Sequence, residues 1–345
     1  MMLKSPSTSK SLLYHVKLYH TITLLMGSLL LLVSCKEADE LSGDNLPGYS
    51  PVLVSVGPVS SFTRGYRPPE MYDNFKVYAA SEKDGAQTVV MDGYEVKFVN
   101  DDWTYVTDSQ PLAYWSPNVD RYLFTAGAPI DAVSAISATS LTLRLEQNTT
   151  GSVMACHPQQ IANSSPDFGK TVSLRFGYAH CRVCVAFIKN STVSVAVNDI
   201  RLTPASAIAT QADMTYTYDW STIPATVTSQ LDNKTTKGDA LAYDDVIIPA
   251  NTADAVLSAT RYYCVPDADN TNNWDISITC DGEQKTASFV NSETWESGKN
   301  YIYVFSLEEK TPKLVNVITQ DSPEEFFDCN DIIPGGKFSN TDMTE

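Results

Sequence analysis

Alternation of apolar and polar residues with a period of two recurs along most of this chain. In the segment Thr171 to Tyr178 one face would hold Val172, Leu174, Phe176 and Tyr178. Successive side chains of a β-strand point to opposite faces, so this pattern is typical of a half-buried strand. No helical heptad or long amphipathic stretch stands out. We therefore expect an all-β fold of antiparallel β-sandwiches.

Two Asp-Gly pairs indicate β-hairpins. Asp92-Gly93 lies between two strand-like runs, and Asp281-Gly282 lies between a run from Trp274 and a run ending at Val290. Both central residues of a type I′ turn need a positive φ, which Asp-Gly accepts readily. The sequence therefore predicts a turn at each pair.

The N-terminus has the pattern of an export signal. Lys4, Lys10 and Lys17 precede the apolar run Ile22 to Val33, which Ser34-Cys35 closes. About twenty apolar residues are needed to span a bilayer, so this run is short for a membrane anchor. We interpret residues 1–34 as a lipoprotein signal peptide and Cys35 as the lipidated first mature residue, anchored in the outer membrane. An ordinary secretory signal or a single transmembrane anchor is the alternative.

The charge balance limits the partners. The chain has 24 Lys and Arg against 41 Asp and Glu, a net charge of -17, and residues 1–34 contribute no acidic residue. Such a chain is repelled by nucleic acids and by anionic membrane surfaces at close range. We expect no nucleic-acid partner and an exposed location at the cell surface.

The length and the strand pattern favour two domains. About 310 mature residues suffice for two hydrophobic cores, and the strand pattern restarts near Asn190. We expect an N-terminal sandwich over residues 35–190, a C-terminal sandwich over 191–311, and a strand with a tail over 312–345.

Several segments resemble the fimbrillin-like proteins of Bacteroidales. They are Phe75 to Ala79, Tyr114 to Pro117, Tyr122 to Ala126, Val172 to Phe176, Ala179-His180, Val183 to Phe187 and Trp295 to Tyr303. The resemblance implies two tandem transthyretin-like sandwiches built as subunits of surface pili, which support adhesion and biofilm formation. It also implies other pilin subunits as partners, and host or bacterial surface ligands as further candidates.

The resemblance extends to a cleavage site at Arg64. A cut there would release residues 35–64, which include the alternating run Val52, Val54, Val56. Losing a first strand would open an apolar groove that a neighbour's strand could fill. We expect the donated strand in residues 312–320, with Leu314, Val315 and Val317. If Arg64 is not cut, the protein would instead be a lipid-tethered anchor of the fibre.

Six cysteines besides Cys35 suit an oxidising compartment. They are Cys156, Cys181, Cys184, Cys264, Cys280 and Cys329. A bridge between Cys264 and Cys280 is conceivable, although the connectivity stays open. Cys181 and Cys184 form a Cys-x-x-Cys motif, but residues three apart on a strand point to opposite faces. We therefore expect neither a redox pair nor a metal site from this motif.

Catalytic signals are few. The mature chain has only His157 and His180, and it has no nucleophile elbow, phosphate-binding glycine loop or zinc-protease motif. The acidic loop Asp267 to Asn273 lacks the glycine and distal glutamate of a calcium-binding hand. We expect no enzyme activity, cofactor or metal. A second hypothesis is a monomeric surface lipoprotein that binds glycans through exposed aromatic residues, with Trp103, Trp220 and Trp274 as candidates.

Overall fold

The protein is all-β in a computed structural model that describes residues 50–56, 72–105, 109–252, 254–308 and 310–321. The described residues contain no α-helix and only two single turns of 3-10 helix, η1 (Ile130–Ala132) and η2 (Ala268–Asn270). None of these residues belongs to a helix long and apolar enough to cross a membrane. The expected all-β class is confirmed, whereas the transthyretin-like topology of two tandem domains stays a prediction.

The described residues fall into two compact units. One comprises residues 50–51 and 114–116, where the backbone N–H of Trp115 donates to the Ser50 carbonyl over 2.9 Å. The other comprises the rest of the described chain, and the sheets below belong to it.

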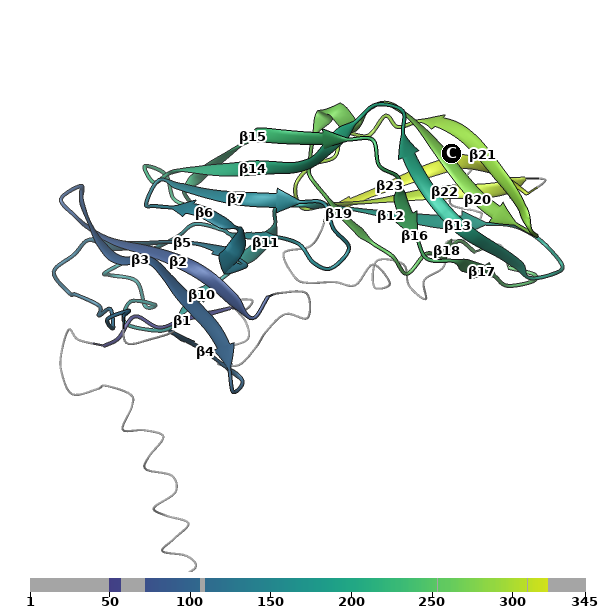
Figure 1. Ribbon diagram of the computed structural model, residues 1–345. Coiled ribbons are helices and arrows are strands. Elements are labelled where there is room, and N and C mark those ends of the chain that lie inside the picture. The colour runs from purple at the N-terminus through teal and green to yellow at the C-terminus, as the bar shows by residue number, and fades with distance from the viewer. Residues whose placement is uncertain (1–49, 57–71, 106–108, 253, 309, 322–345) are drawn as a thin grey trace, which may run out of the picture. The chain divides into compact units, whose positions relative to one another are not determined.

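A seven-stranded sheet occupies the first part of the chain (Figure 1). Its strands are β2 (Asn74–Lys83), β3 (Ala86–Val99), β4 (Asp102–Tyr105), β5 (Arg121–Ala128), β8 (Met154–Cys156), β9 (Gln159–Ala162) and β11 (Phe176–Tyr178). Their order is β11-β8-β5-β2-β3-β4, with β9 also paired to β5, and all pairings are antiparallel. A separate two-stranded sheet pairs β1 (Val54–Val56) in parallel with β10 (Val172–Leu174).

A four-stranded sheet packs against the seven-stranded one. Its order is β15-β14-β7-β6, with β6 (Val133–Ile136), β7 (Ser140–Glu146), β14 (Ile208–Asp219) and β15 (Thr226–Lys237). Leu123 of β5 shares a buried core with Leu141 and Leu143 of β7 and Met214 of β14. Strands from both sides of residue 190 therefore share one sheet and one core. The domain boundary expected at residues 190–191 stays a prediction, and any such division has to accommodate the β7–β14 ladder.

Two further sheets form a sandwich in the last part of the chain. The β12 sheet contains β12 (Cys181–Ile188), β18 (Val256–Leu257), β19 (Tyr262–Cys264), β22 (Lys299–Glu308) and β23 (Thr311–Asp321). The β13 sheet contains β13 (Val195–Pro204), β16 (Leu241–Tyr243), β17 (Val246–Ile248), β20 (Asn273–Cys280) and β21 (Glu283–Val290). Their facing side chains form a buried core, which includes Val183, Phe187, Trp274, Tyr303 and Phe305.

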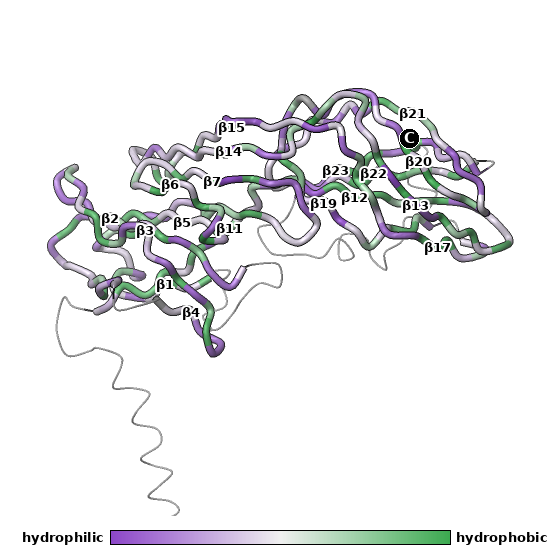
Figure 2. The backbone as a smooth tube through the Cα atoms, viewed as in Figure 1, coloured by the Kyte–Doolittle hydropathy of each residue, from purple (hydrophilic) through white to green (hydrophobic). Residues whose placement is uncertain are grey.

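Strand β12 is buried on both faces. Val183, Val185 and Phe187 lie in the sandwich core, as expected, whereas Cys184, Ala186 and Ile188 lie in a second apolar cluster on the other face. Most other strands alternate, with hydrophobic and hydrophilic residues following each other along the chain (Figure 2). Edge strand β15 differs, because its residues are mostly hydrophilic and eleven of its twelve are exposed (Figure 2).

One of the two expected hairpin turns is confirmed. Asp281 and Gly282 have φ of 52° and 78°, and they join β20 to β21 as a two-residue turn. The turn expected at Asp92-Gly93 is wrong, because β3 runs through both residues. Val77 pairs with Tyr94 and Ala79 pairs with Met91, so Asp92 and Gly93 form a bulge opposite Tyr78.

Candidate assembly site: the first strand and the last

The first strand is short, and in the part of the chain that the structure describes its ladder partner is β10. Its register partners on β10 are Val54↔Val172, Ser55↔Ser173 and Val56↔Leu174. The backbone N–H of Val52 also donates to the Ala113 carbonyl, and that of Val172 donates to the Leu53 carbonyl. Among the described residues, the ladder between β1 and β10 is three register pairs long, which suits a removable strand.

The side chains of β1 are nevertheless core residues. Val54 and Val56 of β1, and Val52 just before it, are each at most 4% exposed. Val172 and Leu174, the register partners of Val54 and Val56, are equally buried. Burying a valine or leucine side chain contributes about 1.5–3 kcal/mol. Departure of β1 would therefore expose an apolar face on β10 as well as an unpaired backbone edge. The sequence indicated this strand, but its alternation could not identify β10 as the partner.

The expected donor segment is part of the chain's own β12 sheet. β23 pairs antiparallel with β22 from Glu308↔Thr311 to Lys299↔Asp321. Leu314 and Val317 pack against the sandwich core, and Val315 is exposed. Residues 312–320 could be donated only if this ladder first opened.

Some expected site residues lie outside the described residues. They are the signal peptide at 1–34, the lipidation site Cys35, the cleavage site Arg64 and the tail from residue 322, with Cys329. Lipidation and cleavage therefore stay predictions.

The tryptophans expected to bind glycans are buried. Trp103, Trp220 and Trp274 are 7%, 6% and 2% exposed. Their rings contact other aromatic side chains, for example Phe75 beside Trp103 at 5.1 Å and Trp295 beside Trp274 at 5.6 Å. An indole that fills a core cannot offer its face to a sugar. The assignment of these three residues to a surface glycan platform is thus wrong.

A buried polar network surrounds Trp295. Its indole N–H donates to the Tyr303 hydroxyl over 2.9 Å, and that hydroxyl donates to Asn291 Oδ1 over 2.8 Å. Asn291 in turn donates to the Asn270 carbonyl. The loop that contains Asn270 is therefore structural in this part of the protein. It joins β19 of the β12 sheet to β20 of the β13 sheet, so it is not a hairpin loop.

His180 is also a packed residue. It is 1% exposed, and its Nδ1 accepts the backbone N–H of Val153 over 3.1 Å. Burial lowers the pKa of His180 to about 4. A neutral ring with one nitrogen committed to the backbone is a poor general base, so the geometry supports the structural interpretation.

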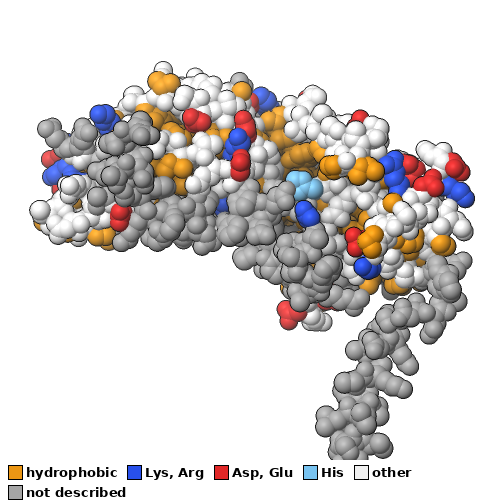
Figure 3. All heavy atoms as spheres, turned by 180° about the vertical axis from the view of Figure 1, so that it is seen from behind, with side chains coloured by type: hydrophobic (Ala, Val, Ile, Leu, Met, Phe, Trp, Pro, Cys, Tyr) orange, Lys and Arg blue, Asp and Glu red, His pale blue; other side chains and the backbone are white. Residues whose placement is uncertain are grey.

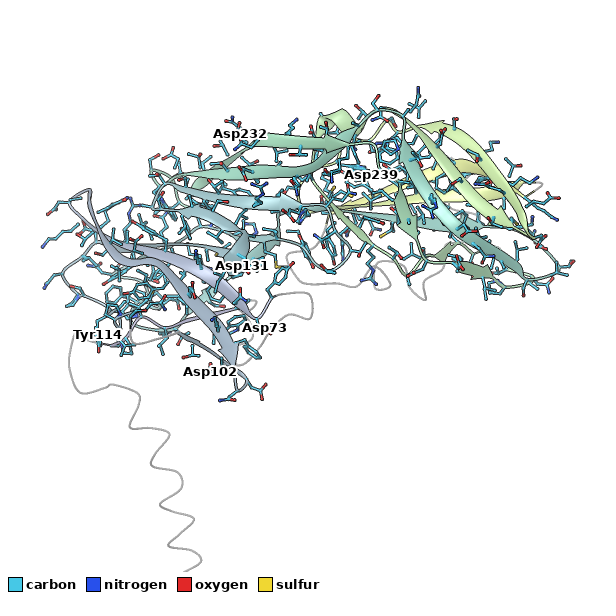
Figure 4. The ribbon with its side chains drawn as sticks, in the orientation of Figure 1. Asp73, Asp102, Tyr114, Asp131, Asp232 and Asp239 are labelled. Carbon is cyan, nitrogen blue, oxygen red and sulfur yellow. The ribbon has the colours of Figure 1, made fainter. Side chains whose placement is uncertain are left out.

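Acidic side chains do not converge on a site in the described part of the chain. Figure 4 labels five of them: Asp102 is in β4, Asp131 in η1 and Asp232 in β15, whereas Asp73 and Asp239 lie between strands. The described residues hold no group of three His, Cys, Asp or Glu side chains placed to bind a metal. On the face in Figure 3, acidic and basic side chains are interspersed among the residues drawn in colour.

Five cysteines lie in the described residues, and all five are buried and unbridged. Cys181 belongs to the sandwich core and Cys184 to the cluster on the opposite face of β12, as their spacing predicted. The strand register does not favour the Cys264–Cys280 bridge that the sequence left open. Cys264 is paired with Cys181, whereas Cys280 is paired with Val197 and Glu283.

The sequence profile described as fimbrillin-like matches residues 67–322. This range covers most of the chain, from before β2 to the end of β23. The chain belongs to the fimbrillin-like family. A comparison with curated proteins gave no match.

Solved structures that match this chain include proteins from Bacteroides and Porphyromonas. A "putative cell adhesion protein" from Bacteroides uniformis is 11% identical, with a TM-score of 0.49 over 81% of this chain and 100% of that one. A fimbrial protein from Bacteroides ovatus is 13% identical, with a TM-score of 0.35 over 74% of this chain and 48% of that one. The fimbrial anchor protein Mfa2 from Porphyromonas gingivalis is 12% identical, with a TM-score of 0.29 over 78% and 96%.

Proposed function

We propose that this protein is a structural subunit or anchor of cell-surface pili that serve adhesion. The observation that carries the proposal is the fimbrillin-like match over residues 67–322. In this proposal the chain is exported as a lipoprotein on Cys35 and its partners are other pilin subunits. The role is structural rather than enzymatic.

The proposed joint between subunits is the place of β1. Cleavage after Arg64 would leave β1 held only by its contacts with the rest of the protein. Three backbone register pairs link it to β10, and its valines fill the core there. A strand from a neighbour could replace both the backbone pairing and the apolar side chains. The geometry of β1 supports this step.

The proposed donor is the last strand of the chain's own β12 sheet. If residues 312–320 are donated, β23 has to leave β22, and the ten register pairs between them would be lost first. A truncation after Thr311 tests this assignment, because subunits that still polymerise without β23 would exclude it as the donor.

An engineered disulfide that holds β1 on β10 tests the proposed exchange of β1 between subunits. Val54 and Val172 are direct register partners, so the double variant Val54→Cys, Val172→Cys should be able to form a bridge. After arginine-specific proteolysis we expect fibres from the wild type, none from the oxidised double variant, and fibres again after reduction. Val54→Cys alone is the matched control. Fibres from the bridged protein would contradict exchange at β1.

The residue at which the mature protein begins distinguishes a cleaved pilus subunit from a lipid-tethered anchor. Mass measurement of protein shed in fibres should give a start at Gly65 for a cleaved subunit, and Arg64→Ala should abolish that start. A lipidated start at Cys35 on protein at the fibre base supports the anchor role. A lipidated protein that is never found with fibres would contradict both.

A further inference from the structure

Cys181 and Cys264 face each other across two neighbouring strands. They are direct register partners in the antiparallel pairing of β12 with β19. Opposite residues in such a pair have Cα atoms about 4.5–5.5 Å apart, and disulfides span about 4.4–6.8 Å between Cα atoms. The Cα separation typical of such a register pair thus lies within the range that disulfides span.

The two side chains also point to the same side. Both cysteines are fully buried and belong to the sandwich core. The Cys181 thiol donates a hydrogen bond to the Cys264 carbonyl over 3.5 Å, and the Cys181 side chain is among the groups that raise the pKa of the Cys264 thiol. The sulfur atoms are thus neighbours in a site with no access for solvent.

No other described cysteine competes for this partner. Cys184 lies on the opposite face of β12, in the second apolar cluster. Cys280 belongs to β20 in the facing sheet, with Val197 as its register partner there. Cys156 belongs to β8 in the seven-stranded sheet.

We propose that Cys181 and Cys264 form a disulfide in the exported protein that ties β19 to β12. The inference rests on the proposed function in one respect, because export takes the chain to a compartment that oxidises thiols. The bridge would close the long segment that contains β13 to β18.

The oxidant is a disulfide-donor protein of the export compartment. One cysteine thiolate attacks the oxidant's disulfide and forms a mixed disulfide, which releases one oxidant thiol. The second thiolate then displaces the other oxidant sulfur. The chain loses two protons and two electrons, and the oxidant's disulfide becomes two thiols.

This reaction has to precede closure of the sandwich. Burial raises the pKa of the Cys264 thiol well above its usual value, so the folded protein holds little thiolate at this position. The bridge would therefore form while β19 docks on β12, and it would be protected from reductants afterwards.

Peptide mapping tests the bridge. The full chain is exported with its own leader, purified without reductant, alkylated in denaturant with iodoacetamide, and digested with trypsin and Asp-N. Trypsin cuts after Arg182, between Cys181 and Cys184, and Asp-N cuts before Asp267, between Cys264 and Cys280. We expect residues 176–182 joined to residues 262–266, split by reductant, with residues 183–189 and 275–280 alkylated.

Variants give the matched control. Cys181→Ser should leave Cys264 alkylated, whereas Cys280→Ser should keep the joined peptides. Because the folded bridge is shielded, each protein is reduced in denaturant and refolded with reductant present. This treatment should lower the melting temperature of the wild type and of Cys280→Ser by on the order of 5–10 °C, and that of the double variant Cys181→Ser, Cys264→Ser by much less. If a variant fails to fold, the peptide map of the wild-type protein still shows whether Cys181 and Cys264 are joined.

Two results would overturn the proposal. One is alkylation of both Cys181 and Cys264 in the exported wild type. The other is either residue joined to a different cysteine. Peptide mapping does not depend on fibre formation, so the disulfide proposal and the pilus proposal can be contradicted independently. A bridged protein that never enters fibres would contradict only the pilus role, and fibres built from unbridged chains would contradict only the disulfide.

Discussion

His180 Nδ1 accepts a hydrogen bond from the backbone N–H of Val153 over 3.1 Å. An accepting Nδ1 is unprotonated, so the ring is neutral and holds its proton on Nε2. The contact joins the residue before β12 to the residue before β8, and both residues are buried. The folded state therefore depends on an uncharged histidine between two sheets.

We expect the protein to lose stability in mild acid through His180. Burial lowers its pKa from 6.5 to about 4, so the unfolded chain binds a proton at a pH where the folded chain does not. The stabilisation is present above pH 6.5 and is lost as the pH falls towards 4, by up to about 3 kcal/mol. Urea unfolding at several pH values measures it.

His180→Asn is the variant that isolates this contribution. An amide oxygen can accept the Val153 N–H but does not titrate, so the variant should lose less stability than the wild type between pH 6.5 and 4. His157→Asn serves as the control and should keep the wild-type slope. Equal slopes for wild type and His180→Asn would contradict the assignment.

The sequence predicted individual strands well, because alternation is a local signal. Turns were harder, and three Asp-Gly pairs show why. Asp281-Gly282 and Asp84-Gly85 both take positive φ and form two-residue turns, whereas Asp92-Gly93 forms a bulge within β3. The dipeptide permits the conformation, but the strand lengths on either side decide whether the chain reverses.

Pairing between distant strands could not be predicted from local pattern. β10 and β11 come from one alternating run, yet they pair with β1 and β8 respectively. Burial could not be predicted for the tryptophans either, since an indole suits a core as well as a sugar-binding surface. The candidate site was therefore predictable at β1 itself, while its partner β10 and the pairing of β23 required the structure.

Gly127→Ala should destabilise the protein by about 1–3 kcal/mol. A Cβ at this position would lie 2.8 Å from Leu143 Cδ2 and 2.9 Å from Val133 Cγ2, in the core between two sheets. Urea unfolding measures the effect. Gly238→Ala is the matched control, because its Cβ would meet nothing within 4 Å. Similar stabilities for the two variants would show that the sheets can separate to admit a methyl group.

Trp295→Phe should lower the free energy of unfolding by about 1–2 kcal/mol, since it removes the indole donor to Tyr303 and keeps an aromatic ring. Tyr303→Phe should cost a similar amount, because it leaves the Trp295 N–H and Asn291 Oδ1 without this partner. The double variant should lose less than the two single variants together. Strict additivity in this double-mutant cycle would argue against a shared network.

A piece that ends at residue 190 should not fold into a stable monomer. It would lack β14, which pairs with β7 from Gln211↔Glu146 to Thr217↔Ser140. It would also lack Met214 and Trp220, which cover the same core as Leu141 and Leu143. An open edge beside exposed leucines favours association. Circular dichroism and size-exclusion chromatography should show a poorly structured or aggregated piece 50–190, and a monomeric folded piece 50–321. A cooperatively unfolding monomer of 50–190 would instead support a domain boundary at that residue, and would mean that the β7–β14 ladder joins two parts able to fold separately.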